Sequence, residues 1–378
     1  MPRRLLFVVE SSTDVRLVEG LADRFDLQVL ARPPSDGVAI SQPLRRAVAV
    51  EVGPGGRLAF ARRSWAAVRR PGAPLDGVLV QGYGLVALAA NLAARTRRLP
   101  SRMLVCSPAE AYYRCRRAEP VADRPFRAWE LWAIQILGRL NRWFGQGYVV
   151  LSHHLASVVA SHGRAARPVD VVPVYGVDLE VFRPSALPRS ELRARLGLPA
   201  TGALLLFSSR IAPEKDAGTL LTALRGLLDG GRDVWLLHRS GGHRAFLDAA
   251  GRAGVAERVV ATDARDPRDG LAADYQAADL CVQASRAEGL GFSALEALAC
   301  GTPVVASSVG GLIETIRDGE TGWTCPPGDP VALASAIAEA LDDPAEASRR
   351  AEAGRALVAE GFASDTVFDR LAEVLGAP

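Results

Sequence analysis

The rarest basic residue in this sequence lies in one of its most informative segments. Of 45 basic side chains only Lys215 is a lysine, and it follows Arg210 in a proline-containing loop. An ammonium is a compact point charge, whereas a guanidinium is planar and forked. The single lysine therefore marks a position that needs the small cation, or it is a lysine by chance. Two cations before a helix could neutralise one diphosphate. Otherwise they form surface pairs with Glu214 and Asp216.

A second segment places two carboxylates eight residues apart. Glu288 and Glu296 flank a loop that contains Gly289 and Gly291. Such glycines let a ligand approach backbone N–H groups closely, and the two acids could address different ends of a long ligand. The structural alternative is a capping box, in which Glu296 only satisfies the backbone N–H of Ser293 at a helix start.

These loops need strands and helices to position them. Apolar runs of strand length alternate with helix-like stretches, which is typical of parallel α/β units, and a helix is predicted over 217–228. Prolines and a glycine interrupt the pattern at 172–184. We therefore predict two doubly wound domains, 1–180 and 181–360, and a C-terminal helix within 361–378 that could cross back to the first. The predicted strands are 5–9, 78–81, 103–106, 148–151, 169–172, 203–207, 234–238, 259–261, 280–283 and 303–306.

The composition is that of a folded enzyme-sized protein. The 378 residues are 49% hydrophobic and 23% charged, which excludes a disordered chain. No apolar run reaches membrane-spanning length, the opening run is too short for a signal peptide, and five cysteines show no pairing pattern, so we expect a cytoplasmic protein. Residues 1–183 hold 26 basic and 15 acidic side chains. This excess could face an anionic acceptor or membrane surface, or simply be a solvated surface.

The two motifs together resemble those of the retaining glycosyltransferases of family 4. The resemblance rests on the Arg210/Lys215 pair, the E-x7-E motif of Glu288 and Glu296, the segment 299–307 that follows it, and the glycines of 310–322. It is strong from about 172 to 330, whereas the first 170 residues match only in strand order and length. It implies the GT-B architecture: two Rossmann-like domains facing across a cleft, the first binding the acceptor and the second the nucleotide sugar.

The resemblance also implies roles for individual residues. The counterpart of Glu296 binds the ribose hydroxyls, and that of Glu288 lies beside the donor sugar. Arg210 and Lys215 would neutralise the departing diphosphate and, with Glu288, form the catalytic set. The nucleobase would pass the segment 261–265. The expected donor-binding residues are Gly289, Leu290, Gly291, Phe292, Ser293, Glu296, Ala264 and Arg265. The donor would be a UDP- or GDP-sugar, and no metal or cofactor is implied, since the sequence has no Asp-x-Asp triplet.

The first half departs from the family in two loops. The usual Gly-Gly loop is replaced by residues 10–14, and a stretch that often holds a histidine reads Cys-Ser-Pro-Ala-Glu at 106–110. We predict acceptor contacts from Ser12, Thr13, Ser107 and Glu110. Retention in the family is thought to use front-face attack assisted by the leaving phosphate, so a protein base is not required and we expect an active enzyme.

One further segment, 124–144, mixes tryptophans and arginines at helical spacing. It could lie on a membrane surface and reach a lipid-linked acceptor, or it could be an ordinary core helix of the first domain.

We therefore expect a hexosyl- or N-acetylhexosaminyltransferase (EC 2.4) that acts on a hydroxyl of a saccharide, a lipid-linked molecule or a small metabolite, and no nucleic-acid partner. Two alternatives remain: a catalytically silent sugar-nucleotide-binding protein, and a GT-B-like sugar-nucleotide epimerase, for which acid/base residues in the first half would be needed.

Overall fold

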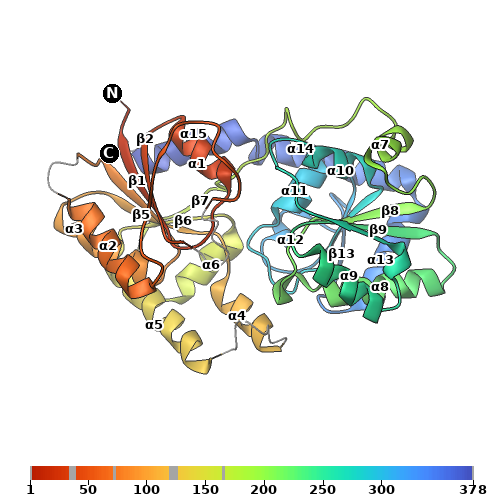
Figure 1. Cartoon of the computed structure of the whole chain (residues 1–378), viewed down its shortest axis with the longest axis horizontal. Helices are drawn as coiled ribbons and strands as arrows, with labels where there is room; N and C mark the ends of the chain where they lie inside the picture. Colours follow the sequence, from red (N-terminus) through yellow and green to blue (C-terminus); the bar gives the residue numbers. More distant parts are fainter. Residues whose placement is uncertain (1, 34–39, 71–73, 119–126, 164–166, 377–378) are drawn as a thin grey trace. The chain divides into compact units, whose positions relative to one another are not determined.

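The computed structural model describes residues 2–33, 40–70, 74–118, 127–163 and 167–376, and the chain divides into two compact units (Figure 1). The first unit comprises Met1–Glu110, Arg127–Gly176 and Asp365–Pro378, and the second comprises Ala111–Phe126 and Val177–Ser364. The main division falls inside the predicted connection at 172–184. Residues beyond 364 group with the first unit.

The first unit is built on a parallel sheet of seven strands in the order β3-β2-β1-β4-β5-β6-β7. The chain runs from β1 outward to β3 and then returns to the other side of β1, so the order reverses between β1 and β4. The strands are β1 (Arg4–Val9), β2 (Asp26–Ala31), β3 (Ala49–Val52), β4 (Gly77–Gln81), β5 (Ser101–Val105), β6 (Tyr148–Val150) and β7 (Val169–Val171).

Helices connect these strands and cover the sheet. They are α1 (Val15–Ala22), α2 (Arg57–Arg69), α3 (Leu85–Thr96), α5 (Ala128–Phe144), α6 (His153–Ser161) and α15 (Ser364–Gly376). The helix α4 (Ala109–Ala118) follows β5, but its residues from Ala111 onward group with the second unit. The last helix packs on α1 at Gly20, where an added Cβ would lie 2.2 Å from the ring of Phe368. Only a glycine leaves room for this ring, so the first and last helices of the chain share one packed contact.

The second unit repeats the plan with six parallel strands in the order β10-β9-β8-β11-β12-β13. The order reverses between β8 and β11. The strands are β8 (Ala203–Phe207), β9 (Val234–Arg239), β10 (Val259–Thr262), β11 (Leu280–Gln283), β12 (Val304–Ser307) and β13 (Trp323–Cys325). The helices are α7 (Arg189–Leu196), η1 (Pro213–Lys215), α8 (Ala217–Asp229), α9 (His243–Arg252), η2 (Ala256–Arg258), α10 (Leu271–Ala277), α11 (Phe292–Ala299), α12 (Leu312–Thr315), α13 (Pro330–Asp342) and α14 (Pro344–Gly361).

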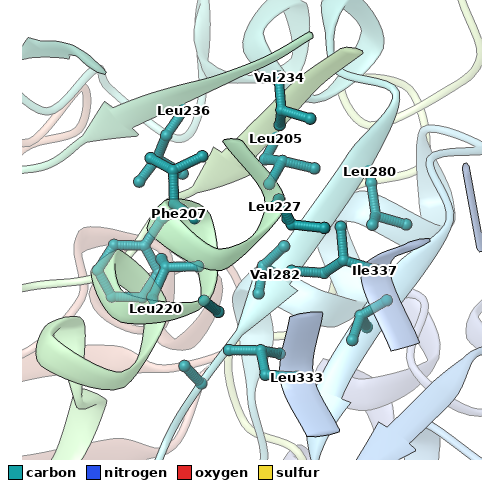
Figure 2. Close-up of a cluster of buried hydrophobic side chains, with 14 of the residues drawn as sticks. Leu205, Phe207, Leu220, Leu227, Val234, Leu236, Leu280, Val282, Leu333 and Ile337 are labelled. Atoms are coloured by element: carbon teal, nitrogen blue, oxygen red, sulfur yellow. The ribbon is translucent and has the colours of Figure 1, made fainter. Parts of the chain in front are cut away.

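The core of the second unit lies between this sheet and the helices α8 and α13. Figure 2 shows Leu205 and Val282 of the central strands packed with Leu220, Leu227 and Ile337 of the two helices. All five side chains are buried, and each contributes about 1.5–3 kcal/mol relative to exposure. This rigid layer holds the carboxyl ends of β8 and β11 in place.

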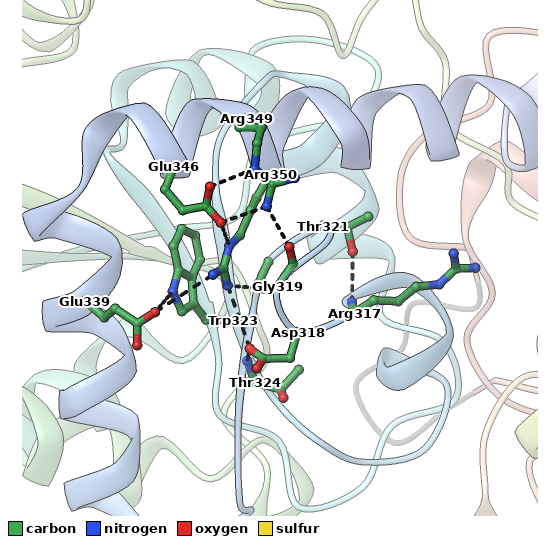
Figure 3. Close-up of polar contacts among 11 residues, drawn as sticks. Arg317, Asp318, Gly319, Thr321, Trp323, Thr324, Glu339, Glu346, Arg349 and Arg350 are labelled. Carbon is green, nitrogen blue, oxygen red and sulfur yellow. Dashed lines mark hydrogen bonds and ion pairs between the residues drawn. The ribbon is translucent and has the colours of Figure 1, made fainter.

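A polar cluster attaches α13 and α14 to the edge strand β13 (Figure 3). The guanidinium of Arg350 lies over the ring of Trp323, 3.9 Å from its centroid, and donates to the Gly322 carbonyl at 2.9 Å. Its Nε donates to Glu346 at 2.7 Å, while the indole N–H of Trp323 donates to Glu339 at 2.8 Å. The stacking and the hydrogen bonds fix both helices against the end of the sheet.

The two parallel, doubly wound domains predicted from the sequence are thus confirmed. Within the predicted C-terminal segment 361–378 the chain forms the helix α15, which Phe362 and Ala363 separate from α14. At this break the backbone N–H of Val177 donates to the Phe362 carbonyl at 2.7 Å, and the Val177 carbonyl accepts the backbone N–H of Ser364 at 3.0 Å.

Candidate functional site

The reversal of strand order in the second unit creates a crevice at the carboxyl ends of β8 and β11. Ligands of open α/β sheets bind at such switch points. The loop after β8 contains residues 208–215 with Arg210 and Lys215, and the loop after β11 contains residues 284–291 with Glu288. The topology therefore brings the two predicted motifs together at one edge of the sheet.

The ammonium of Lys215 forms an ion pair with the carboxylate of Glu288. Both side chains are about nine-tenths buried, with 13% and 9% of their surface exposed. The Glu288 carboxylate also accepts the backbone N–H of Gly289 at 3.1 Å and lies 3.4 Å from the hydroxyl of Ser285. The pair thus places a fixed cation and a fixed anion in the crevice.

The loop that carries Lys215 is held by two acidic neighbours. Glu214 is fully buried, and its main-chain carbonyl accepts the backbone N–H of Arg286 at 2.9 Å. Asp216 has a left-handed backbone, with φ 49°, and its side chain caps α8 by accepting the N–H of Thr219. The same carboxylate accepts Nε of Arg286 at 2.7 Å. These bonds lock the two loops of the crevice to each other.

Three side chains fix the start of the same loop. Ser293 of α11 donates its hydroxyl to the Ser208 carbonyl at 2.7 Å, and Ser209 donates to Gln283 at 3.2 Å. His238, at the end of β9, donates Nε2 to the Ser209 carbonyl at 3.1 Å. Burial lowers the pKa of His238 to about 4, so the ring is neutral near pH 7 and keeps the donated proton on Nε2.

The helix α11 begins at the bottom of the loop after β11. Its N-cap is Gly291 with φ 95°, and no side chain of the described residues caps it, so the positive end of the helix dipole faces the crevice. Gly310 packs directly against the same loop: a Cβ there would lie 2.0 Å from the Glu288 carbonyl oxygen. The glycine is therefore required for the loop to keep its path.

Glu296 lies one helical turn inside α11 and is buried. Its carboxylate accepts the hydroxyl of Tyr275 at 2.8 Å. Burial, with the adjacent carboxylate, raises the pKa of Tyr275 well above its ordinary value, so this hydroxyl remains a donor. The capping-box alternative is wrong: the N-cap is Gly291, and the hydroxyl of Ser293 bonds to Ser208 instead.

The remaining residues predicted for the donor site lie around the same edge. The side chain of Arg210 is 67% exposed, and its guanidinium lies 3.4 Å from the carboxylate of Glu214. This is the pair with Glu214 that the sequence offered as the alternative to diphosphate binding, except that Glu214 is buried and not a surface residue. Ala264 is exposed after β10, and Nε of Arg265 lies 3.3 Å from the buried Asp274. Gly289 and Leu290 are buried, and Phe292 and Ser293 are half-buried at the helix start.

The first unit has its own switch point between β1 and β4. Of the predicted acceptor residues, Ser12 is exposed, and Thr13 is buried with no hydrogen-bond partner for its hydroxyl among the described residues. Gln81, at the end of β4, instead accepts the hydroxyl of Ser11 at 3.1 Å. Glu10 directly follows β1, and burial raises the pKa of its carboxyl group.

Ser107 and Glu110 follow β5, the strand next to β4. Ser107 is half-buried, and the Glu110 carboxylate lies 3.4 Å from Nε2 of the buried His162. The ring of His162 packs on Tyr83 with 4.9 Å between centroids. Burial raises the pKa of the neighbouring Cys106 thiol to about 11, so this residue is a neutral thiol and not a nucleophile near pH 7.

Comparison with known proteins identifies the family. A family model described as glycosyl transferases group 1 matches residues 188–357. The 2-deoxystreptamine glucosyltransferase of Streptomyces kanamyceticus is 33% identical over 299 residues, which are 78% of this chain and 75% of that protein. The chain belongs to the group 1 glycosyltransferases. A D-inositol 3-phosphate glycosyltransferase of Catenulispora acidiphila is 38% identical over 228 residues, 57% of this chain, and the match spans about half (53%) of that relative.

Solved structures of other proteins share the fold of this group 1 glycosyltransferase. The sucrose-phosphate synthase of Thermosynechococcus elongatus has a TM-score of 0.78 at 20% identity and covers 98% of both chains. HepE of Anabaena, in complex with UDP and glucose, has a TM-score of 0.76 at 20% identity over the full length of both chains. The predicted GT-B fold is thereby confirmed.

Sequence reasoning did not identify several residues that support the site of this glycosyltransferase. Tyr275, His238 and Gln283 lie far along the chain from the loops they hold, and nothing in their local sequence predicts those contacts. Asp216 could have been found, because an aspartate directly before a predicted helix is a common N-cap. His162 reaches Glu110 only through the fold.

Proposed function

We propose that this glycosyltransferase transfers a hexosyl group from a nucleoside-diphosphate sugar to a hydroxyl acceptor, with retention of configuration and without a metal. The observation that carries the proposal is the buried Lys215–Glu288 pair at the switch point of the second sheet, beside the uncapped start of α11. This arrangement offers a cation and a helix dipole to a diphosphate, and a carboxylate to the sugar next to it.

The proposed reaction is a single displacement at the anomeric carbon. The bond from this carbon to the diphosphate oxygen breaks, a bond to the acceptor oxygen forms on the same face, and the acceptor proton passes to a leaving phosphate oxygen. Negative charge grows on the diphosphate as its bond breaks, so Lys215 stabilises the transition state more than the ground state. Glu288 holds the ammonium in place and faces the sugar.

The nucleoside is proposed to bind deeper in the crevice. Glu296 would accept the ribose hydroxyls, and the Tyr275 hydroxyl that it accepts fixes its orientation. The main chain at Ala264 and Arg265 would pass the base. We propose UDP as the nucleotide and glucose as the first sugar to test, since HepE was solved with UDP and glucose and the Streptomyces kanamyceticus relative is named a glucosyltransferase.

Incubation with UDP- and GDP-sugars, with and without acceptor hydroxyl compounds, tests the proposal. We expect release of nucleoside diphosphate that depends on an acceptor, and a product whose anomeric configuration in proton NMR equals that of the donor. Conversion of the donor sugar without an acceptor would favour an epimerase. Binding without turnover on a wide acceptor panel would favour a silent sugar-nucleotide-binding protein.

The proposed independence of metal has its own test. Turnover should persist in excess EDTA, because Lys215, Arg210 and the start of α11 supply the countercharge. Loss of turnover in EDTA that magnesium or manganese restores would contradict this part of the proposal alone.

A further inference from the structure

The helix α5 of the first unit turns its polar and small residues toward the protein. Asn141 is buried and donates its amide to the Tyr83 carbonyl at 2.8 Å and to the Leu137 carbonyl at 2.9 Å. Gly138 lies so close to His162 that an added Cβ would meet the ring at 2.9 Å. Two of the buried positions of α5 are therefore an asparagine and a glycine, whereas the large apolar Ile134 and Leu137 are only half-buried.

The outward face of α5 is aromatic. Trp129, Trp132 and Trp143 are 59%, 66% and 67% exposed, and Leu140 and Phe144 are exposed as well. At 100° per residue the three indoles and Leu140 fall on one face of the helix. An ordinary core helix, one of the two readings of segment 124–144, is thus wrong for its tryptophans; residues 124–126 of that segment lie outside the described residues.

The surroundings of α5 are basic. The helix packs against α3, which packs against α2, and the three helices lie next to one another in Figure 1. Together they contain seven arginines and one acidic residue, Glu130. Arg57 pairs with Glu10, directly after β1, and Arg63 pairs with Glu51 of β3. Four others are exposed: Arg62, Arg69, Arg95 and Arg139.

We propose that α5 binds in the plane of an anionic lipid bilayer, with its tryptophans at the boundary between headgroups and acyl chains. Tryptophan is enriched at this depth, and arginines beside it are attracted to anionic lipids. Residues 128–144 would extend roughly 25 Å along the surface at 1.5 Å per residue. None of the helices in the described ranges could span a bilayer.

A second copy of the chain fits this face less well. Two such faces brought together would each contribute an excess of exposed arginines, and like charges oppose that association. An anionic bilayer instead supplies both the apolar layer and the countercharge. This inference is independent of the proposed donor site, which is built from residues of the second unit.

Co-sedimentation of the full chain with vesicles tests the proposal. We expect binding to phosphatidylcholine vesicles that contain phosphatidylglycerol, little binding to phosphatidylcholine alone, and a blue shift of tryptophan emission on binding. W129S/W132S/W143S should lower the partition coefficient at least about tenfold, since binding scales with the buried apolar area. The control I313S/V331S removes two exposed apolar side chains of the second unit and should bind as the wild type does.

The charge component has a separate pair of variants. R62Q/R139Q should lower the partition coefficient roughly 25-fold, about fivefold for each arginine near the surface, and R252Q/R355Q should leave it unchanged. Thermal shifts with UDP should be equal in all variants, which separates this inference from the donor site. Equal vesicle binding by the tryptophan variant and the wild type would overturn the proposal. So would a dimer in sedimentation velocity that the tryptophan variant abolishes while neither protein binds vesicles.

Discussion

Replacement of Lys215 by alanine should affect both turnover and stability, and the two effects can be separated. Removing the ammonium leaves the Glu288 carboxylate about nine-tenths buried without its cation. Breaking a buried pair from one side costs about 3–5 kcal/mol. The Gly289 N–H at 3.1 Å still stabilises the carboxylate, so we expect the lower end, about 3 kcal/mol of unfolding free energy.

The effect on turnover has a different origin. If Lys215 stabilises charge on the leaving diphosphate, its loss resembles that of a preorganised oxyanion donor, about 2.7–4 kcal/mol, or roughly 10²–10³ in kcat. Lys215→Arg should also be impaired, because a planar fork cannot occupy the position of a point charge between the two loops.

The double variant K215A/E288Q separates the two effects. With the carboxylate neutralised, no uncompensated charge remains, so most of the lost stability should return. Turnover should not return, since the cation is still absent. Glu288→Gln alone keeps a buried ammonium without its anion and should also be destabilised.

The measurements are urea denaturation for stability and steady-state kinetics at saturating donor for kcat, on variants whose circular dichroism matches the wild type. Near-normal kcat in Lys215→Ala would refute the catalytic argument. A double variant no more stable than Lys215→Ala would refute the argument from the buried pair.

Three further predictions concern the same unit. Glu296→Gln should weaken UDP binding by about 1.5–3 kcal/mol in calorimetry, the range for a hydrogen bond to a charged group, while the melting temperature changes little because a glutamine oxygen can still accept the Tyr275 hydroxyl; unchanged affinity would remove the carboxylate from ribose binding. Gly310→Ala should destabilise the protein by more than about 2 kcal/mol in urea denaturation, because its Cβ would lie 2.0 Å from a carbonyl oxygen; a stable variant would show that this loop shifts easily. Burial lowers the pKa of His238 to about 4 in the folded protein. As pH falls from about 6.5 toward 4, only the unfolded chain gains a proton on this ring, so the free energy of unfolding falls by up to about 3 kcal/mol. His238→Gln should therefore lose less unfolding free energy than the wild type between pH 7 and pH 4.5, and equal losses would contradict the lowered pKa.

Much of the fold could be predicted because buried parallel strands are short continuous apolar runs. The strands 203–207 and 280–283 were predicted with the bounds that the structure gives, and the helix after Asp216 begins where expected. Two strands at one side of the first sheet, β2 and β3, were missed. In β2 the polar Asp26 and Gln28 interrupt the apolar run, and β3 is a four-residue Ala-Val-Glu-Val segment that is exposed at the sheet edge. β13, with three residues, is too short for periodicity to detect.

The site could be predicted only where its residues are close in sequence. Composition singled out Lys215 as the one lysine, and the spacing of two acids brought out Glu288. Their ion pair, however, joins residues 73 apart in the sequence, on two loops that meet through strand order. The support from His238 depends on the same topology. For α5, the sequence contains both an apolar and a polar face, and only the packing of Asn141 against Tyr83 decides which of them turns inward.

The contact between Gly20 and Phe368 has a consequence for synthesis of the chain. At about 5–20 residues per second, the ribosome needs roughly 17–70 s to proceed from one of these residues to the other. During that time the second unit, whose main segment Val177–Ser364 is continuous, can complete its core. The unit that begins to emerge first is therefore finished last, and until then the surface of α1 that receives the phenyl ring is exposed to chaperones and proteases.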